Sequence, residues 1–117
     1  MIRRLPLAGV AVFAAALCAC TKPQESGVKV IVGARFEPGA GRPAIEYSVI
    51  VVADGKFRAV GAQSATPVPK GSEITGGLGM TVRAVSDDTP IEVGRDANLV
   101  LQGGGQRREM RNGEWVH

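Results

Sequence analysis

Apolar and polar positions alternate most clearly between residues 45 and 61, where the chain reads I-E-Y-S-V-I-V-V-A-D-G-K-F-R-A-V-G. A β-branched run reaches Asp54-Gly55, and a second strand pattern follows at once. Asp-Gly between two such runs predicts a hairpin with a type I′ turn, because both central residues of that turn need a positive φ. The segment therefore predicts two antiparallel strands joined by a two-residue loop.

Counting outward from this loop gives the register of the predicted hairpin. The cross-strand pairs are Ala53 with Lys56, Val52 with Phe57, Val51 with Arg58, Ile50 with Ala59 and Val49 with Val60. Successive side chains point to opposite faces of a strand. One face is therefore expected to belong to the core, with Ile50, Val52, Phe57 and Ala59. The other face combines valines with the aliphatic stems of two cationic side chains, namely Val49, Val51, Val60, Lys56 and Arg58. We expect this face to be only partly exposed to water.

Shorter strand patterns follow one another along the chain after residue 27, separated by proline- and glycine-rich segments. Residues 28–34 predict a first strand, with its three valines, Val28, Val30 and Val32, on one face. Further strands or short extended pieces are expected at 73–75 (an edge strand), 80–85, 91–93 and 97–101. Loops are expected at 35–43 and 62–72, because proline and glycine favour turns over strand interiors.

A second turn signal, Asn112-Gly113, lies between the strand patterns 106–110 and 114–117. Its type I′ register pairs Arg111 with Glu114, Met110 with Trp115 and Glu109 with Val116. No segment after residue 20 has a helical period, and sixteen glycines and seven prolines against five aromatic residues favour a turn-rich β-protein. The predicted fold class is all-β, a small sandwich of about seven short antiparallel or mixed strands.

The first twenty residues, M-I-R-R-L-P-L-A-G-V-A-V-F-A-A-A-L-C-A-C, carry two arginines followed by an apolar stretch that ends in small residues. This is the pattern of a secretory signal peptide, and it is too short for a full bilayer span. The ending Leu17-Cys18-Ala19-Cys20 resembles the lipobox of bacterial lipoproteins, which implies that Cys20 is lipidated as the first mature residue. Cys18 departs from the usual residue at its position. The alternative is an ordinary signal peptide in which both cysteines are incidental.

The chain is thus expected to have three parts: a lipoprotein signal peptide at 1–19, a lipidated tether at 20–27 and a β-domain at 28–117. The tether is polar, T-K-P-Q-E-S-G after the cysteine, and would hold the domain off the membrane by a short flexible arm. Thr21 rather than aspartate follows Cys20, so in a cell with two membranes we expect an outer-membrane lipoprotein facing the periplasm. The domain itself contains no cysteine, which excludes a disulfide or a cysteine-based metal site within it.

The net charge of +3 is modest and depends on the N-terminal segment. Without Arg3 and Arg4 the chain has 12 basic against 11 acidic residues, a net charge of +1. No dense basic run or row of aromatic residues accompanies this charge. We therefore expect no nucleic acid partner.

Several motifs, in order, resemble the N-terminal strands of metal-dependent amidohydrolases, and most of all the imidazolonepropionase-like and dipeptidase-like members. Between residues 30 and 83 they are V-I-V-G-A-R, G-R-P-A-I-E, V-I-V-V-A-D-G-K-F-R-A-V-G, P-V-P-K-G-S-E-I and G-M-T-V-R. Two later motifs, I-E-V-G-R-D-A-N-L-V-L and R-E-M-R-N-G-E-W-V, resemble the segments with which that family re-enters the same domain. The resemblance implies a composite β-sandwich built by both ends of the chain, with a (β/α)₈ barrel inserted between them in the family.

The same resemblance implies that the barrel is missing from this chain. After G-M-T-V the family continues into a turn, an aspartate and a His-x-His motif, whereas here R-A-V-S-D-D follows. The family's bridging lysine, its other metal-binding histidines and its catalytic aspartate would also lie in the barrel. A turn around residues 86–90 is expected to replace it and to join the two halves of the sandwich directly.

The residue types also argue against a hydrolytic site in this chain. Such a site needs about three or four ligand side chains around one metal ion, and the only histidine is the final residue, His117. The adjacent Asp87 and Asp88 would point to opposite faces of an extended strand, although a turn could change this. No serine has an evident base for nucleophilic catalysis, and this applies to Ser48, Ser64, Ser72 and Ser86.

Two further pairs of residues have a structural interpretation. Glu46 and Glu92 are expected to be solvent-facing strand residues rather than an acid–base pair. Phe57 and Trp115 are expected to belong to the core rather than to a ligand platform. We therefore expect no catalytic residue, no metal and no cofactor.

The expected function is that of a non-catalytic, lipid-anchored β-domain that binds another envelope protein or a ligand. Loss of the barrel would uncover an apolar surface, which must become polar, remain as an exposed apolar patch or be buried by a partner. A protein partner or a homodimer is therefore expected on this surface. The alternative is an accessory part of a C–N bond hydrolase whose metal-binding barrel is supplied by another chain. A decayed gene remnant is the third hypothesis.

Overall fold

The computed structural model describes residues 27–116, and within this range the fold is all-β. It contains nine strands and no α-helix: β1 (Lys29–Val32), β2 (Arg35–Glu37), β3 (Ser48–Ala53), β4 (Lys56–Ala62), β5 (Glu73–Gly76), β6 (Thr81–Arg83), β7 (Leu99–Gly103), β8 (Gln106–Arg111) and β9 (Glu114–Val116). The predicted fold class is confirmed, with nine strands instead of about seven. The predicted signal peptide and Cys20 lie outside the described residues, as does His117.

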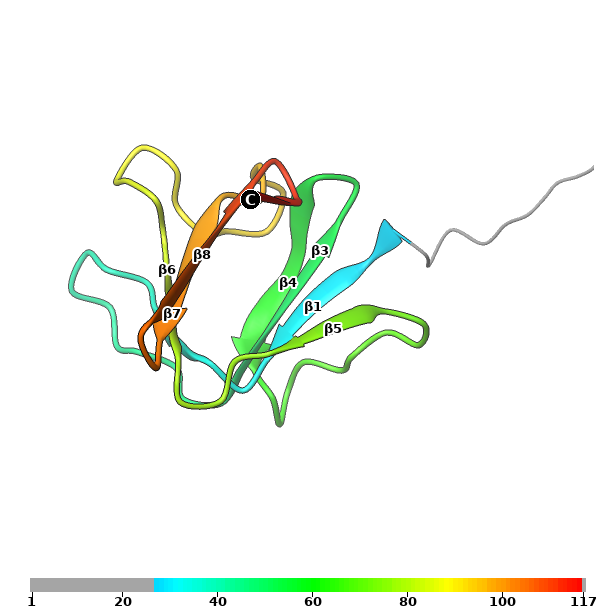
Figure 1. Cartoon of the computed structure of the whole chain (residues 1–117), viewed down its shortest axis with the longest axis horizontal. Coiled ribbons are helices and arrows are strands. Elements are labelled where there is room, and N and C mark those ends of the chain that lie inside the picture. The colour runs from blue at the N-terminus through cyan, green and yellow to red at the C-terminus, as the bar shows by residue number, and fades with distance from the viewer. Residues whose placement is uncertain (1–26, 117) are drawn as a thin grey trace, which may run out of the picture.

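The strands form two mixed sheets that face each other as layers (Figure 1). One sheet has four strands in the order β4-β3-β1-β5, and the other has five in the order β2-β6-β7-β8-β9. Each sheet contains one parallel pair, β1 with β5 and β2 with β6, while the other neighbours are antiparallel. Residues before position 84 supply six strands, and residues after position 98 supply the remaining three.

The main core lies between the two sheets. The four-stranded sheet contributes Ile31, Ile50, Val52 and Phe57, and the five-stranded sheet contributes Phe36, Val82, Leu99, Leu101 and Met110. Three residues outside the strands, Ala34, Ile91 and Ala97, complete this cluster. Burial of these side chains is the main source of stability for a sandwich of this size.

The register of the central hairpin matches the prediction only next to the turn. Ala53 pairs with Lys56 and Val52 with Phe57, as predicted, but the register then shifts by one residue at a β-bulge. The observed pairs are Val51 with Ala59, Ile50 with Val60 and Val49 with Gly61, so Arg58 is the extra residue. A bulge reverses the alternation of side chains beyond it. Ala59 therefore leaves the predicted core face, and Val60 packs against the main core instead.

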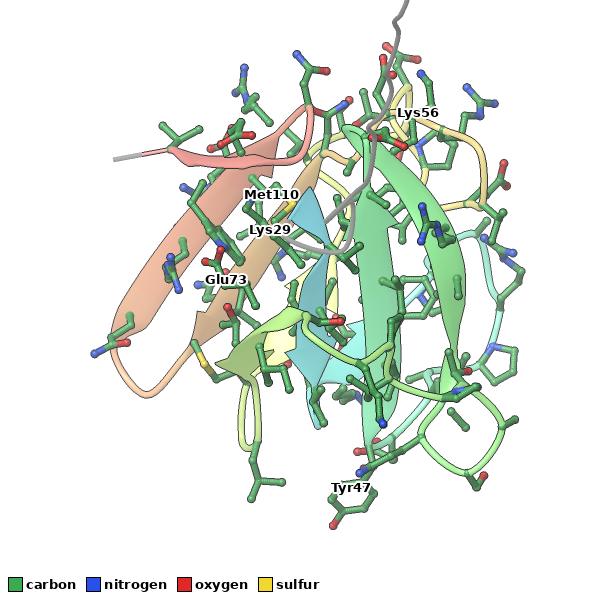
Figure 2. The ribbon with its side chains drawn as sticks, turned by 90° about the vertical axis from the view of Figure 1, so that its right-hand side faces the viewer. Lys29, Tyr47, Lys56, Glu73 and Met110 are labelled. Atoms are coloured by element: carbon green, nitrogen blue, oxygen red, sulfur yellow. The ribbon has the colours of Figure 1, made fainter. Side chains whose placement is uncertain are left out.

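The outer face of the four-stranded sheet is apolar and buried, which corrects the expectation of a partly wet face. Its cluster consists of Val28, Val30, Val49, Val51 and Ala53, with Val32 and Ala59 packed against it. β4 and β5 lie at opposite edges of the sheet, so the connection 63–72 must cross one of its faces. The two figures show it crossing the outer face (Figures 1 and 2). The crossing is close at Thr66, because a Cβ on Gly61 would lie 2.5 Å from its hydroxyl oxygen.

Two other segments differ from the sequence-based expectation. Residues 35–37 form strand β2 although 35–43 was expected to be a loop, and the amide and carbonyl groups of Phe36 bond to Ile45 on its other side. Phe36 is buried between two exposed or half-exposed charged residues, which places a single apolar anchor in a short strand. The expected extended piece at 91–93 forms no strand; Ile91 is buried, but a turn begins at Val93.

The C-terminal hairpin has the predicted register, with Arg111 opposite Glu114, Met110 opposite Trp115 and Glu109 opposite Val116. Its turn packs directly against the turn of the central hairpin. Gly55 and Gly113 both have positive φ, and a Cβ on Gly113 would lie 2.7 Å from the Cα of Gly55. The two strongest turn signals of the sequence thus meet in space, and only glycine allows so close an approach.

The segment 94–97 covers the outer edge of β4. Phe57 donates its N–H to the carbonyl of Arg95 (2.9 Å) and accepts from the N–H of Gly94 (2.8 Å), while Ala97 donates to the carbonyl of Gly55 (2.8 Å). The C-terminal part of the chain is therefore hydrogen-bonded to the four-stranded sheet as well as packed against it. No helix within residues 27–116 is long and apolar enough to cross a membrane.

Candidate functional site

The predicted lipidation site, Cys20, lies outside the described residues. Within residues 27–116, no group of three or more histidine, cysteine, aspartate or glutamate side chains could hold a metal ion. Asp87 and Asp88 are exposed in a turn that is closed by the bond from the Thr89 N–H to the carbonyl of Ser86. The same turn holds the Ser86 hydroxyl 3.3 Å from the Thr89 hydroxyl.

Glu46 and Glu92 are both solvent-facing, as predicted, although neither lies in a strand. They belong to different ion pairs: Glu46 contacts Arg35, and Glu92 lies 3.6 Å from Arg95. The pKa of Arg35 is raised by its hydrogen bond to Glu37 and by the charge of Glu46. The two glutamates form no acid–base pair.

The remaining candidates have structural roles in the described part of the chain. The buried Ser48 donates its hydroxyl to the carbonyl of Ala34 at 2.7 Å, and Ser72 donates to the carbonyl of Pro69. Phe57 is buried in the core, as predicted. Trp115 is half-buried against the core, with the guanidinium of Arg108 4.0 Å from its ring centroid. An arginine over an indole face is a favourable cation–π contact.

Several hollows lie along the loops 38–43 and 84–93, and two of them differ in polarity. The first, of about 520 Å³, is lined by both loops and carries Arg42, Ser86, Asp87 and Glu92 as its charged or hydroxyl groups. The second, of about 430 Å³, is mostly apolar and lies where β4 and β2 approach each other, lined in part by Val60, Ile45 and Val93. Both are open and shallow. A small ligand could lie in them, but no nucleophile is paired with a base there.

The outer face of the five-stranded sheet is polar and crossed by ion pairs. Glu109 contacts both Arg107 and Arg111, and Arg35 contacts Glu37 and Glu46. Arg83 donates to the side-chain carbonyl of Gln102 at 2.8 Å. Exposed ion pairs of this kind add little stability, but their charges keep this broad face hydrated.

Three exposed large apolar side chains lie near one edge and one end of the described domain, whereas others, such as Val93 and Val116, lie elsewhere. Ile74, on the edge strand β5, is 59% exposed, and Leu78, just beyond that strand, is 74% exposed. Tyr47 is 61% exposed and shares a shallow hollow with Leu78. Figure 2 shows Tyr47 directed away from the body, at the end of the molecule opposite Lys56. Sequence reasoning identified the strand 73–75 as an edge but not the exposure of these side chains.

Tyr47 also has an unusual backbone conformation, with φ of 50°. A bulky non-glycine residue at positive φ is strained by about 1 kcal/mol or more. Hydrogen bonds on both sides hold it there: Ser48 donates its N–H to Ala34, and Gln63 donates to the carbonyl of Tyr47. A positive φ at tyrosine has no signature in the sequence, so this residue could not be identified in advance.

The comparisons with known proteins give partial similarities of structure. No protein-family model matches the chain, and a comparison with curated proteins gives no match. A prolidase candidate from Bifidobacterium longum is similar over 50% of this chain and 16% of its own, with 21% sequence identity and a TM-score of 0.44. A molinate hydrolase is similar over 50% of this chain and 12% of its own, with 21% identity and a TM-score of 0.43. The chain thus spans under a fifth of each, and a likeness of this extent identifies neither a family nor an activity.

Proposed function

We propose that this protein is a lipid-anchored, non-catalytic β-domain that acts as an interaction module in a bacterial cell envelope. The observation that carries the proposal is the closure of the sandwich by its own chain. The segment 94–97 bonds to the edge of β4, and the turn at Gly113 packs on the turn at Gly55. The described domain therefore has a complete core without an inserted domain.

The resemblance to the composite domain of metal-dependent amidohydrolases supports the proposed origin of the domain. In that family a barrel is inserted between the two halves, at the position of the turn around residues 86–90, which lies within the connection 84–98 of this chain. Here this connection is short and tied at both ends, by the turn at Ser86 and by the bonds of residues 94–97 to β4. We propose that the chain keeps the supporting sandwich of that family and lacks its metal-binding barrel.

The proposed anchor is the lipid on Cys20, in the outer membrane if the cell has two membranes. The test is mass spectrometry of the N-terminal peptide, with membrane fractionation, for the wild type, Cys20→Ser and Cys18→Ser. We expect acylation and membrane association to be lost in Cys20→Ser and kept in Cys18→Ser. Acylation that survives in Cys20→Ser would contradict the anchor.

The second candidate function is an accessory chain of a C–N bond hydrolase whose barrel is a separate protein. The resemblance favours it, because the composite domain of those enzymes has a barrel inserted between its two halves. Affinity purification from solubilised envelope would then recover a protein that carries a His-x-His motif. Stoichiometric zinc in the purified chain alone would contradict the non-catalytic proposal.

A further inference from the structure

The outer edge of β5 offers backbone hydrogen-bonding groups that no strand among residues 27–116 uses. Glu73 donates its N–H to Val28, and Gly77 donates to Val32, both on the β1 side. The directions of N–H and C=O groups alternate along a strand. The amide and carbonyl groups of Ile74 and Gly76 therefore point away from β1, toward solvent. This is a row of two donors and two acceptors at the edge of the sheet.

The β5 edge is short and carries one charged residue, Glu73, but it lacks the other features that usually prevent strand addition. Proteins protect such edges with lysine, proline, bulges or covering loops. β5 reads E-I-T-G, which contains no lysine and no proline, and it pairs with β1 without a register shift. The side chain at its centre is the exposed, β-branched Ile74, and Leu78 follows it. A Cβ placed on Gly76 would meet nothing within 4 Å, so the face of the sheet is uncovered at this residue.

The spacing of the outward groups is self-complementary. A two-fold axis at Thr75 places Ile74 of one copy opposite the partner's Gly76, and Gly76 opposite the partner's Ile74. In an antiparallel ladder both of these are hydrogen-bonded pairs, so all four outward groups of each copy are used. Glu73, the only charged residue of β5, falls opposite the partner's Gly77, so no like charges meet.

We propose that a second copy of this chain binds at this edge, by antiparallel pairing of β5 with the β5 of its partner about Thr75. The two four-stranded sheets then continue into one eight-stranded sheet across the two-fold axis, and Ile74 and Leu78 become covered. This inference deepens the proposed function, because it names the partner of the interaction module. Its test reads the register of a cross-link at β5, whereas the anchor is tested by acylation of Cys20, so the two can fail separately.

The size of the edge sets the expected affinity. Stable complexes bury about 800 Å² on each partner, which is more than a strand of four residues and two apolar side chains can supply. We therefore expect weak association in solution. Attachment of both copies to one membrane would raise their effective concentration and favour the dimer.

Cysteine cross-linking tests both the partner and the register. The axis makes Thr75 and the partner's Thr75 a non-hydrogen-bonded pair with Cα atoms about 4.5 Å apart, within the range for a disulfide. The two Glu73 residues are four strand positions apart, or about 14 Å. The full-length variants Thr75→Cys and Glu73→Cys are oxidised in membranes, and their monomers and dimers are then separated without reductant. The wild type is the control for any disulfide formed by Cys18 or Cys20.

We expect about tenfold more disulfide-linked dimer for Thr75→Cys than for Glu73→Cys, because only the first pair lies within disulfide distance. Adding Ile74→Lys to Thr75→Cys should remove this dimer, whereas adding Val93→Lys, at an equally exposed site away from β5, should not. The proposal is overturned if Thr75→Cys gives no more dimer than the wild type. It is equally overturned if Glu73→Cys matches Thr75→Cys, or if Val93→Lys removes the dimer and Ile74→Lys does not.

Discussion

The two edges of the four-stranded sheet, β4 and β5, differ in what covers them. The segment 94–97 lies along β4 and exchanges two hydrogen bonds with Phe57, and an ion pair joins Lys56 to Asp96 at 2.8 Å. Along β5, no segment within residues 27–116 forms a comparable ladder on the outer side. One edge is therefore closed by the same chain, and the other is open to another chain.

This difference separates the stability of the domain from its proposed interaction. The β4 edge joins the C-terminal part of the chain to the sheet built by the N-terminal part, so changes there should unfold the protein. The β5 edge has an exposed side chain at its centre and one neighbouring strand, so changes there should leave folding intact. Four substitutions, in order of decreasing effect on stability, test this difference.

Phe57→Ala should cause the largest loss of stability. The Phe57 side chain is buried between the sheets, and its backbone carries both bonds to residues 94 and 95. Removing a buried phenylalanine side chain costs about 3–5 kcal/mol, because the apolar surface is lost and a cavity remains. Urea unfolding measures the change. The adjacent, exposed Arg58→Ala should change stability by less than about 0.5 kcal/mol, and an equal effect of both would contradict the assignment.

Gly113→Ala should cost about 2–3 kcal/mol, from the strain of positive φ and the clash with the backbone of Gly55. Gly105→Ala is the matched control. It also lies in a two-residue hairpin turn at positive φ, but a Cβ there meets nothing within 4 Å. We expect it to cost about 1 kcal/mol. Equal losses in urea unfolding would mean that the contact between the two turns contributes nothing.

Asp96→Asn should change the dependence of stability on pH at the closed edge. The hydrogen bond from Lys56, followed by its charge, lowers the pKa of Asp96. A carboxyl whose pKa is lowered in the folded state stabilises above its unfolded pKa, near 3.9, and this contribution is lost as pH falls through the folded pKa. Between about pH 7 and pH 2 the wild type should therefore lose slightly more stability than Asp96→Asn. A steeper pH dependence in Asp96→Asn would contradict the pairing with Lys56.

Ile74→Lys, at the open edge, should leave the free energy of unfolding within about 0.5 kcal/mol of the wild type, because the side chain is exposed. Its effect should appear in sedimentation analysis, as loss of the concentration-dependent dimer. Val93→Lys, 64% exposed in the wild type, should preserve both stability and association. A large loss of stability in Ile74→Lys would show that β5 is needed for folding rather than for partner binding.

The sequence predicted best where local turn chemistry decides the structure. Asp54-Gly55 and Asn112-Gly113 both form the predicted turns, and the register of the C-terminal hairpin is correct at all three pairs. At Arg58 the predicted register of the central hairpin was wrong. A β-bulge depends on how the strand packs in the folded sandwich, and it leaves no local pattern in the sequence. The outward valines are buried by a connection that crosses the sheet, which is also a long-range effect.

The candidate site was less predictable than the fold. The edge position of 73–75 followed from its short strand pattern, but the openness of that edge depends on where the other segments lie. β2 was missed because its three residues contain a single apolar anchor, Phe36. The cover on β4 joins residues about forty positions apart, Lys56 and Asp96 among them, and such contacts have no signature in one sequence.

Amide hydrogen exchange at Phe57 and Ile74 tests the difference between the two edges most directly. The account predicts that the Phe57 amide, bonded to Arg95, exchanges only on substantial unfolding at every protein concentration. The Ile74 amide should exchange rapidly in dilute protein and slow as the concentration rises and copies pair. An Ile74 amide whose exchange rate does not depend on concentration, or a Phe57 amide that exchanges as fast as Ile74, would contradict the account.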